Sequence, residues 1–179
     1  VVKFLVFSDL HYNKNSVAIT IEHLNQILKR AAEEKVDFVI QTGDFCTDYA
    51  RSPELIKTYK NNKYNLPVYG VYGNHEMQGG FDNTVELITP TLCNREVNFG
   101  KDGEPFWYTD INGFRIIGLD TNYSFNPETN EWEHNLPNSY GAKAGNHPAS
   151  TYSIIIFLLL LFEYKNKPYR NYVLASTIQ

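Results

Sequence analysis

The chain has 179 residues, of which 42% are hydrophobic and 20% are charged, and its formal net charge is −4 at pH 7. This balance is typical of one globular domain with a sizeable core, and it gives no sign of the basic surface that nucleic-acid-binding proteins carry. The two cysteines have no zinc-site spacing, and a chain of this size favours free thiols in a reducing compartment. With no secretory signal pattern, we expect a cytoplasmic protein.

The first part of the chain alternates between strand and helix patterns. Three short apolar runs predict buried strands, at residues 2–7, 36–40 and 67–72. Apolar spacings of three and four, with capping signals, predict helices at residues 16–35, from Ser52-Pro53 onward, and at 82–88. This alternation predicts βαβ units and a largely parallel sheet.

The pattern changes in the second part of the chain. Residues 106–111 and 114–119 flank Asn112-Gly113, which is a strong signal for a β-hairpin. Residues 124–150 show no clear period and predict either a functional loop or a departure from a normal domain. The apolar run at 154–162 is too short to span a membrane and predicts a buried strand or short core helix, while residues 163–179 show no strong pattern.

Polar side chains follow each of the three predicted parallel strands. Asp9 and His11 follow the first strand, Asp44 follows the second, and Asn74 and His75 follow the third. Each motif is common by chance, but the carboxyl ends of parallel strands share one edge of the sheet, so the three clusters are expected to converge. Two carboxylates side by side repel unless a cation lies between them, and this mixture of donors suits Mn, Fe or Zn better than Ca²⁺.

The segments SDLH, GDF and GNHE resemble the first three motifs of the calcineurin-like metallophosphoesterases, over about residues 2–121. The resemblance implies an α/β fold, a two-sheet sandwich with helices on both outer faces, incomplete at its C-terminal end. It also implies a hydrolase of phosphomonoesters or phosphodiesters that uses two divalent metal ions and a metal-bound hydroxide. The expected partner is a phosphate-ester small molecule or a nucleotide, with no membrane and no stable nucleic-acid partner.

The resemblance also implies a role for each residue that matches a motif. Asp9 and His11 would bind the first metal, Asp44 would bridge the two metals, and Asn74 would bind the second and approach the phosphate. His75 would be the catalytic residue, because the equivalent histidine contacts the phosphate and can protonate the leaving-group oxygen.

The later motifs of the family are missing from the sequence. Neither a histidine after a fourth core strand nor a Gly-His-x-His motif is found, and His147 is the one late histidine that could stand in for a ligand. We therefore expect a metallophosphoesterase portion at residues 1–145 and an atypical segment at 146–179, as a truncated or frame-shifted product would have. Besides an enzyme, there are two alternatives. The first is a catalytically inactive remnant. The second is a membrane-associated interaction protein, which the apolar run at 154–162 argues against, because it is too short to span a membrane and has no strong basic flank.

Overall fold

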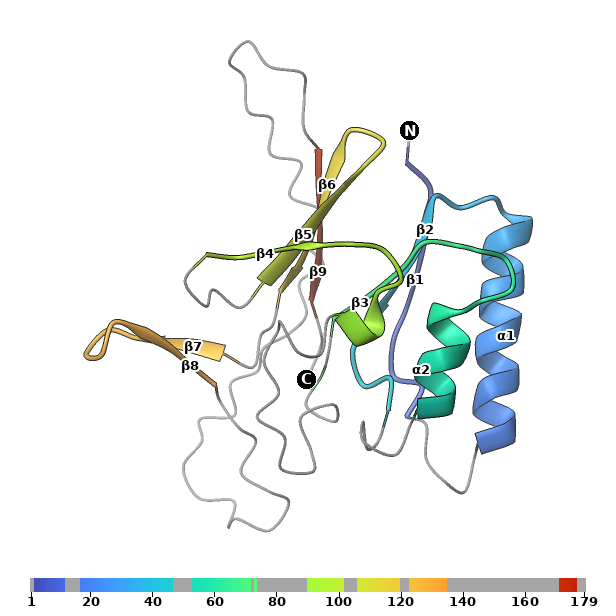
Figure 1. Cartoon of the computed structure of the whole chain (residues 1–179), viewed down its shortest axis with the longest axis horizontal. Coiled ribbons are helices and arrows are strands. Elements are labelled where there is room, and N and C mark those ends of the chain that lie inside the picture. Colours follow the sequence, from blue (N-terminus) through green and yellow to red (C-terminus); the bar gives the residue numbers. More distant parts are fainter. Residues whose placement is uncertain are drawn as a thin grey trace.

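The computed structural model of the chain describes residues 2–11, 17–46, 53–71, 73, 90–101, 106–119, 123–134 and 171–176. Its helices and strands are shown in Figure 1. In chain order they are β1 (Phe4–Phe7), α1 (Val17–Glu33), β2 (Phe38–Thr42), α2 (Pro53–Lys60), β3 (Val68–Val71), β4 (Asn98–Phe99), β5 (Phe106–Ile111), β6 (Phe114–Leu119), β7 (Tyr123–Asn126), β8 (Glu131–His134) and β9 (Asn171–Ser176).

The first sheet is parallel and has the order β1-β2-β3, as the alternation of the sequence predicts. Strand β2 lies in the middle and is buried along its whole length, because it has a neighbour on each side and packed layers on both faces. The prediction of a buried strand was wrong for β1. This strand lies at the edge of the described sheet, where Val6 is 41% exposed.

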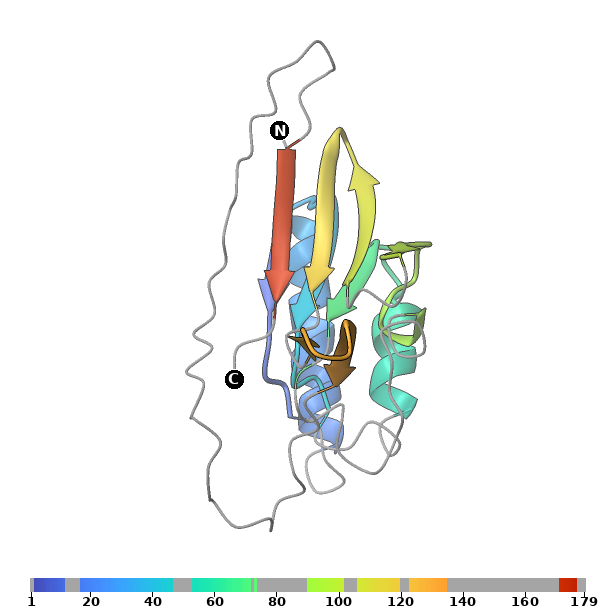
Figure 2. The same cartoon turned by 90° about the vertical axis from the view of Figure 1, so that its left-hand side faces the viewer.

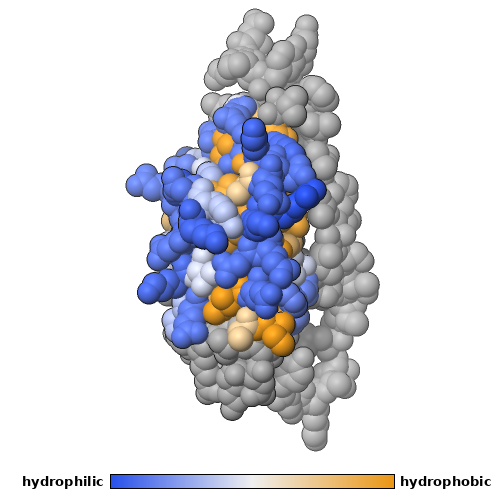
Figure 3. All heavy atoms as spheres, turned by 90° about the vertical axis from the view of Figure 1, so that its right-hand side faces the viewer, coloured by the Kyte–Doolittle hydropathy of each residue, from blue (hydrophilic) through white to orange (hydrophobic). Residues whose placement is uncertain are grey.

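Helices α1 and α2 cover the face of the first sheet that points away from β5 and β6 (Figures 1 and 2). Leu24, Leu28 and Ala31 form the buried stripe of α1, and Leu55 and Tyr59 form that of α2. Their outer surface is mainly hydrophilic (Figure 3), as expected of amphipathic helices. The structure describes no helix on the outer face of the second sheet, and the helix predicted at 82–88 lies outside the described residues.

Neither α1 nor α2 has the pattern of a membrane-spanning segment. In the described residues, no helix combines the length and the apolar composition that are needed to cross a lipid bilayer. The apolar run at 154–162 lies outside the described part of the chain.

The second sheet is built around the predicted hairpin, in the order β4-β5-β6-β9. Asn112 and Gly113 join β5 to β6 with φ angles of 50° and 82°, the two positive values that a tight I′-type turn requires. Strand β9 pairs in parallel with β6, from Phe114 opposite Asn171 to Leu119 opposite Ser176. Residues 163–179 show no strong pattern in the sequence, yet they contain β9, which is formed by pairing with a strand far away in the sequence.

Strands β7 and β8 form a small antiparallel hairpin of their own. The expectation of an irregular stretch over 124–150 is wrong for these residues, which form β7 and β8. The connecting turn contains Asn130 at φ 59°, a conformation that asparagine tolerates well. Two strands of four residues carry too few side chains to show a period in the sequence. Residues 135–150 lie outside the described part of the chain.

The two larger sheets pack face to face through Trp107 of β5. Its ring stacks on Tyr69 at 5.7 Å between centroids, and its Nε1 donates a hydrogen bond of 3.1 Å to the Gly70 carbonyl oxygen. A Cβ atom at Gly118 would lie 2.2 Å from the indole, so only glycine leaves room for this ring. The indole therefore fixes how the second sheet lies against β3.

Candidate metal centre

Three of the predicted ligands come together at the carboxyl ends of β1 and β2. Asp9 and His11 follow β1, and Asp44 follows β2. Each offers one ligand atom, and these three atoms all lie within 4.8 Å of one another. His11 Nε2 lies 3.5 Å from Asp9 Oδ1 and 3.8 Å from Asp44 Oδ2. The convergence expected from parallel strands is thus present for the first two motifs.

Backbone hydrogen bonds hold the two loops side by side beyond the end of the sheet ladder. The Asp9 amide donates to the Gly43 carbonyl oxygen at 3.1 Å, and the His11 amide donates to the Asp44 carbonyl oxygen at 3.0 Å. The chain turns here through left-handed conformations, with φ of 57° at Asp9, 46° at His11 and 48° at Asp44. Such angles are uncommon for residues other than glycine and cluster at functional sites, where surrounding contacts hold them.

The three side chains differ in their exposure to solvent. The Asp44 side chain is 10% exposed, whereas those of Asp9 and His11 are 53% and 42% exposed. Ser8 Oγ donates a short hydrogen bond to Asp9 Oδ2. A buried carboxylate close to a second carboxylate is costly without a compensating positive charge. Two carboxylates and an imidazole at this spacing therefore fit a divalent cation, with one buried side and one side open to solvent.

The third strand reaches the same site through Gly73. A Cβ atom at Gly73 would lie 2.1 Å from Asp44 Oδ1 and 2.8 Å from the Asp44 backbone nitrogen. The backbone that follows β3 thus runs directly against the Asp44 carboxylate. Asn74 and His75 come next in the chain but lie outside the described residues, so their roles stay predictions.

Sequence reasoning missed the contribution of Gln41. This residue is fully buried in β2, and its Oε1 accepts a hydrogen bond of 2.7 Å from the Gly43 amide. Its Nε2 donates to the Val71 carbonyl oxygen at the end of β3. A polar residue directly after the buried run 36–40 is the signal that could have found it, because a buried amide needs partners.

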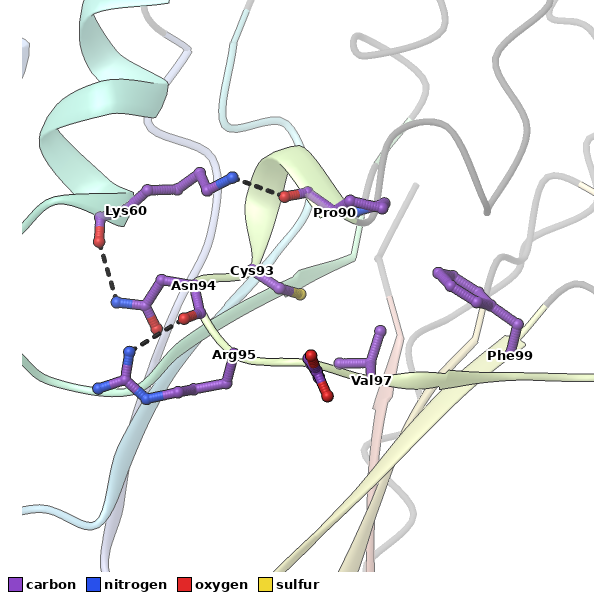
Figure 4. Close-up of a pocket in the computed structure, with 8 residues that line it drawn as sticks. Lys60, Pro90, Cys93, Asn94, Arg95, Val97 and Phe99 are labelled. Carbon is purple, nitrogen blue, oxygen red and sulfur yellow. Dashed lines mark hydrogen bonds between the residues drawn. The ribbon is translucent and has the colours of Figure 1, made fainter.

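A shallow pocket of about 450 Å³ lies elsewhere, between the end of α2 and residues 90–99 (Figure 4). Its described lining includes none of the predicted ligands. Lys60 Nζ donates to the Pro90 carbonyl oxygen at 2.7 Å, and Arg95 Nη1 donates to that of Asn94 at 2.9 Å. Burial raises the pKa of the Cys93 thiol to about 12. Both cations of the described lining thus bond to backbone carbonyl oxygens, and the thiol stays neutral.

Comparison with known proteins agrees with the motifs. The family model described as calcineurin-like phosphoesterase matches residues 2–170. No curated protein matches the chain significantly. Among solved structures, a dimetal phosphatase from Danio rerio is similar at 15% identity and a TM-score of 0.48. The match covers 66% of this chain and 44% of the phosphatase chain. A purple acid phosphatase from yellow lupin (Lupinus luteus) seeds is similar at 18% identity and a TM-score of 0.35. That match covers 67% of this chain and 24% of the lupin chain.

The extent of these matches differs between the two comparisons. The chain spans less than half the length of either solved structure. The family model, by contrast, covers residues 2–170 and thus nearly the whole chain. The chain therefore belongs to the calcineurin-like phosphoesterase family and has a mixed α/β fold of that family.

Proposed function

We propose that the chain is a metal-dependent hydrolase of phosphomonoesters or phosphodiesters with a dinuclear metal centre. The observation that carries the proposal is the cluster of Asp9, His11 and Asp44, whose ligand atoms lie within 4.8 Å of one another. Membership of a phosphoesterase family supports the reaction class. A strained backbone around the cluster, held by cross-loop hydrogen bonds, is what a preorganised site requires.

Each predicted ligand has a distinct part in this proposal. Asp9 and His11 hold the first ion, Asp44 is shared between the two ions, and Asn74 holds the second. When bound, such ions act as Lewis acids on water and on the phosphoryl oxygens. The ligand set suits Mn, Fe or Zn, because it mixes an imidazole nitrogen with carboxylate oxygens. His75 contacts the phosphate and supplies the proton to the leaving-group oxygen.

The environment of Asp44 supports its central role. Its side chain is nearly buried, and Gly73 closes in on the Oδ1 side. A carboxylate in such surroundings has few ways to move, so its two oxygens stay in place for binding. His11 lies within 4 Å of both carboxylates, and its imidazole must be neutral to offer a lone pair to a metal.

The remaining parts of the proposal concern the substrate and the rest of the chain. The substrate is a phosphate-ester small molecule or a nucleotide, and the protein acts in the cytoplasm. Residues 1–145 form the metallophosphoesterase portion and residues 146–179 an atypical segment, which contributes β9 to the second sheet.

Hydrolysis of an aryl phosphate in the presence of Mn²⁺ tests the proposal. We expect Asp44→Asn to lower the rate by about 100-fold or more, because even changes in the partners of metal ligands typically cost about 10–100-fold. His75→Ala should lower the rate by about 100-fold or more, because general acid–base catalysis typically contributes about 100- to 10,000-fold. Asp110→Asn is the matched control. Asp110 is an exposed carboxylate of β5 that pairs with Arg115. Equal activity of the wild type and Asp44→Asn would show that the site is assigned wrongly.

A second candidate is a remnant that retains half of the site and turns over no substrate. The observation that favours it is the missing Gly-His-x-His motif in the sequence. Metal analysis of the purified protein separates the two candidates. Close to two ions per chain would exclude the remnant, and at most one weakly held ion would exclude the dinuclear enzyme.

A further inference from the structure

Gln41 is a polar residue in a strand that is otherwise largely apolar. It lies in β2, whose five residues are all buried, and none of its own surface is exposed. Burying an amide without partners is costly, so each of its hydrogen bonds has an energetic consequence. Both partners of Gln41 lie at the end of the sheet where Asp9, His11 and Asp44 gather.

The two ends of the Gln41 amide contact the loop after β2 and the end of β3. Oε1 accepts a hydrogen bond of 2.7 Å from the amide of Gly43, the residue directly before Asp44. Nε2 donates to the carbonyl oxygen of Val71, two residues before Gly73. One side chain thus joins the loop that carries Asp44 to the end of the strand that places Gly73 against the Asp44 carboxylate.

The space around Gln41 leaves it little freedom to move. A Cβ atom at Gly70 would lie 2.6 Å from Gln41 Nε2, so a glycine at this position of β3 makes room for the amide. The Gly70 carbonyl oxygen accepts a hydrogen bond from Trp107, which holds β3 on its other side. The amide is therefore confined between β2 and a strand that is itself fixed by the second sheet.

The Gly43 backbone explains why such a connection is needed. Gly43 has φ of 112°, and Asp44 follows at φ of 48°, so the turn departs from the extended chain within two residues. Glycine adopts a positive φ without strain, but the left-handed conformation of Asp44 is uncommon for a residue with a side chain and depends on surrounding contacts. The bonds from Asp9 to Gly43 and from His11 to Asp44 hold it from the β1 side, and Gln41 holds it from the β3 side.

We propose that Gln41 is a positioning residue for the metal centre, which sets the Asp44 carboxylate relative to the end of β3. The inference rests on the proposed metal-dependent function. The inference deepens the proposed function, because it assigns the relative placement of the second and third motifs to Gln41, a residue outside all three motifs. A side chain that only satisfied buried groups would affect folding alone, whereas a positioning residue also affects metal affinity.

Three variants separate these two roles. Gln41→Met keeps the length of the side chain and loses both hydrogen bonds. Gln41→Glu retains both in its protonated form, which full burial favours by raising the pKa of the introduced carboxyl group. Asn62→Leu is the matched control. Asn62 is also a buried amide, and it bonds the Tyr59 carbonyl oxygen and both backbone groups of Leu66, away from the predicted ligands.

Calorimetric titration of each folded protein with Mn²⁺, together with urea unfolding, provides the readouts. We expect Gln41→Met to bind Mn²⁺ about 10–100-fold more weakly than the wild type, the range seen when partners of metal ligands are changed. Gln41→Glu should stay within about threefold of the wild type. Asn62→Leu should be less stable but bind Mn²⁺ with unchanged affinity.

The outcomes distinguish this inference from the proposed function. If Gln41→Met is destabilised like Asn62→Leu but binds Mn²⁺ as tightly as the wild type, Gln41 is merely structural and the inference is overturned. If Gln41→Met does not fold, Gln41→Asn takes its place, since a side chain one methylene shorter cannot reach both partners. Affinity equal to the wild type would then overturn the inference. A wild type that binds no Mn²⁺ contradicts the proposed function itself, and the metal role of Gln41 with it.

Discussion

Replacing Gly73 by alanine tests the geometry of the metal centre with one added methyl group. The new Cβ atom would lie 2.1 Å from Asp44 Oδ1, 2.8 Å from Asp44 N and 2.9 Å from Asp44 Cγ. Real Cβ atoms essentially never come closer than 3.0 Å to another heavy atom. The Asp44 carboxylate, the backbone of Gly73, or both must therefore move by about 1 Å in total.

The size of the effect follows from this displacement. Adding a methyl group to a well-packed region typically costs about 1–3 kcal/mol in the free energy of unfolding. The effect on function should be larger, since a misplacement of about 1 Å can cost about 100-fold in rate. We therefore expect Gly73→Ala to fold, with a lower midpoint in urea, and to lose about 100-fold in Mn²⁺-dependent hydrolysis of an aryl phosphate.

The control for this experiment is Gly113→Ala in the hairpin turn. A Cβ atom there meets nothing within 4 Å, but its φ of 82° is strained for any residue with a side chain. The cost in the free energy of unfolding is about 1–2 kcal/mol. Gly113 itself is far from the predicted ligands in the sequence. Gly113→Ala should thus lose stability and keep its affinity for Mn²⁺, as measured by calorimetric titration. The reasoning is refuted if Gly73→Ala binds Mn²⁺ and hydrolyses the ester as the wild type does.

Three further predictions concern metal, packing and pH. Mn²⁺ at about 100 times its Kd should raise the free energy of unfolding by about 2.7 kcal/mol; EDTA should reverse this, and a similar gain in Asp44→Asn would contradict the site. Trp107→Phe removes the bond to the Gly70 carbonyl oxygen and should cost about 1–3 kcal/mol in urea unfolding; an unchanged midpoint would argue against this contact between the sheets. Burial raises the pKa of Cys93 from 9.0 to about 12, so the folded state keeps a proton that the unfolded state loses. The stability from this thiol is therefore complete below pH 9 and declines as the pH rises toward 12. Unfolding curves across this range should show the decline, and Cys93→Ala should reduce it.

The elements that the sequence predicted correctly depend on short-range signals. The long amphipathic period identified α1, the proline at position 53 marked the start of α2, and Asn112-Gly113 placed the hairpin between β5 and β6. Such signals reflect backbone preferences and the need to bury one face, which act within a few residues. The order of these elements was also enough to predict that the ends of β1 and β2 would bring Asp9, His11 and Asp44 together.

Other features depended on partners that are distant in the sequence. Strand β9 forms against β6, about 55 residues earlier in the chain, and the sequence around it shows no strong pattern because pairing rather than periodicity defines it. Val6 is exposed because β1 lies at the edge of the described sheet, which a run of apolar residues does not reveal. The hairpin of β7 and β8 was missed for a different reason, because its strands of four residues are too short to show a period.

The candidate site divides in the same way. The types of residue that follow the strands were enough to predict a metal site, and the motifs were enough to predict the family that the chain belongs to. How the predicted ligands of the first two motifs are held in place could not be read from the sequence. Gln41 joins the loop after β2 to the end of β3, and Gly73 lies against the Asp44 carboxylate with no room for a side chain. These are contacts between neighbouring strands, and their geometry exists only once β2 and β3 are packed side by side.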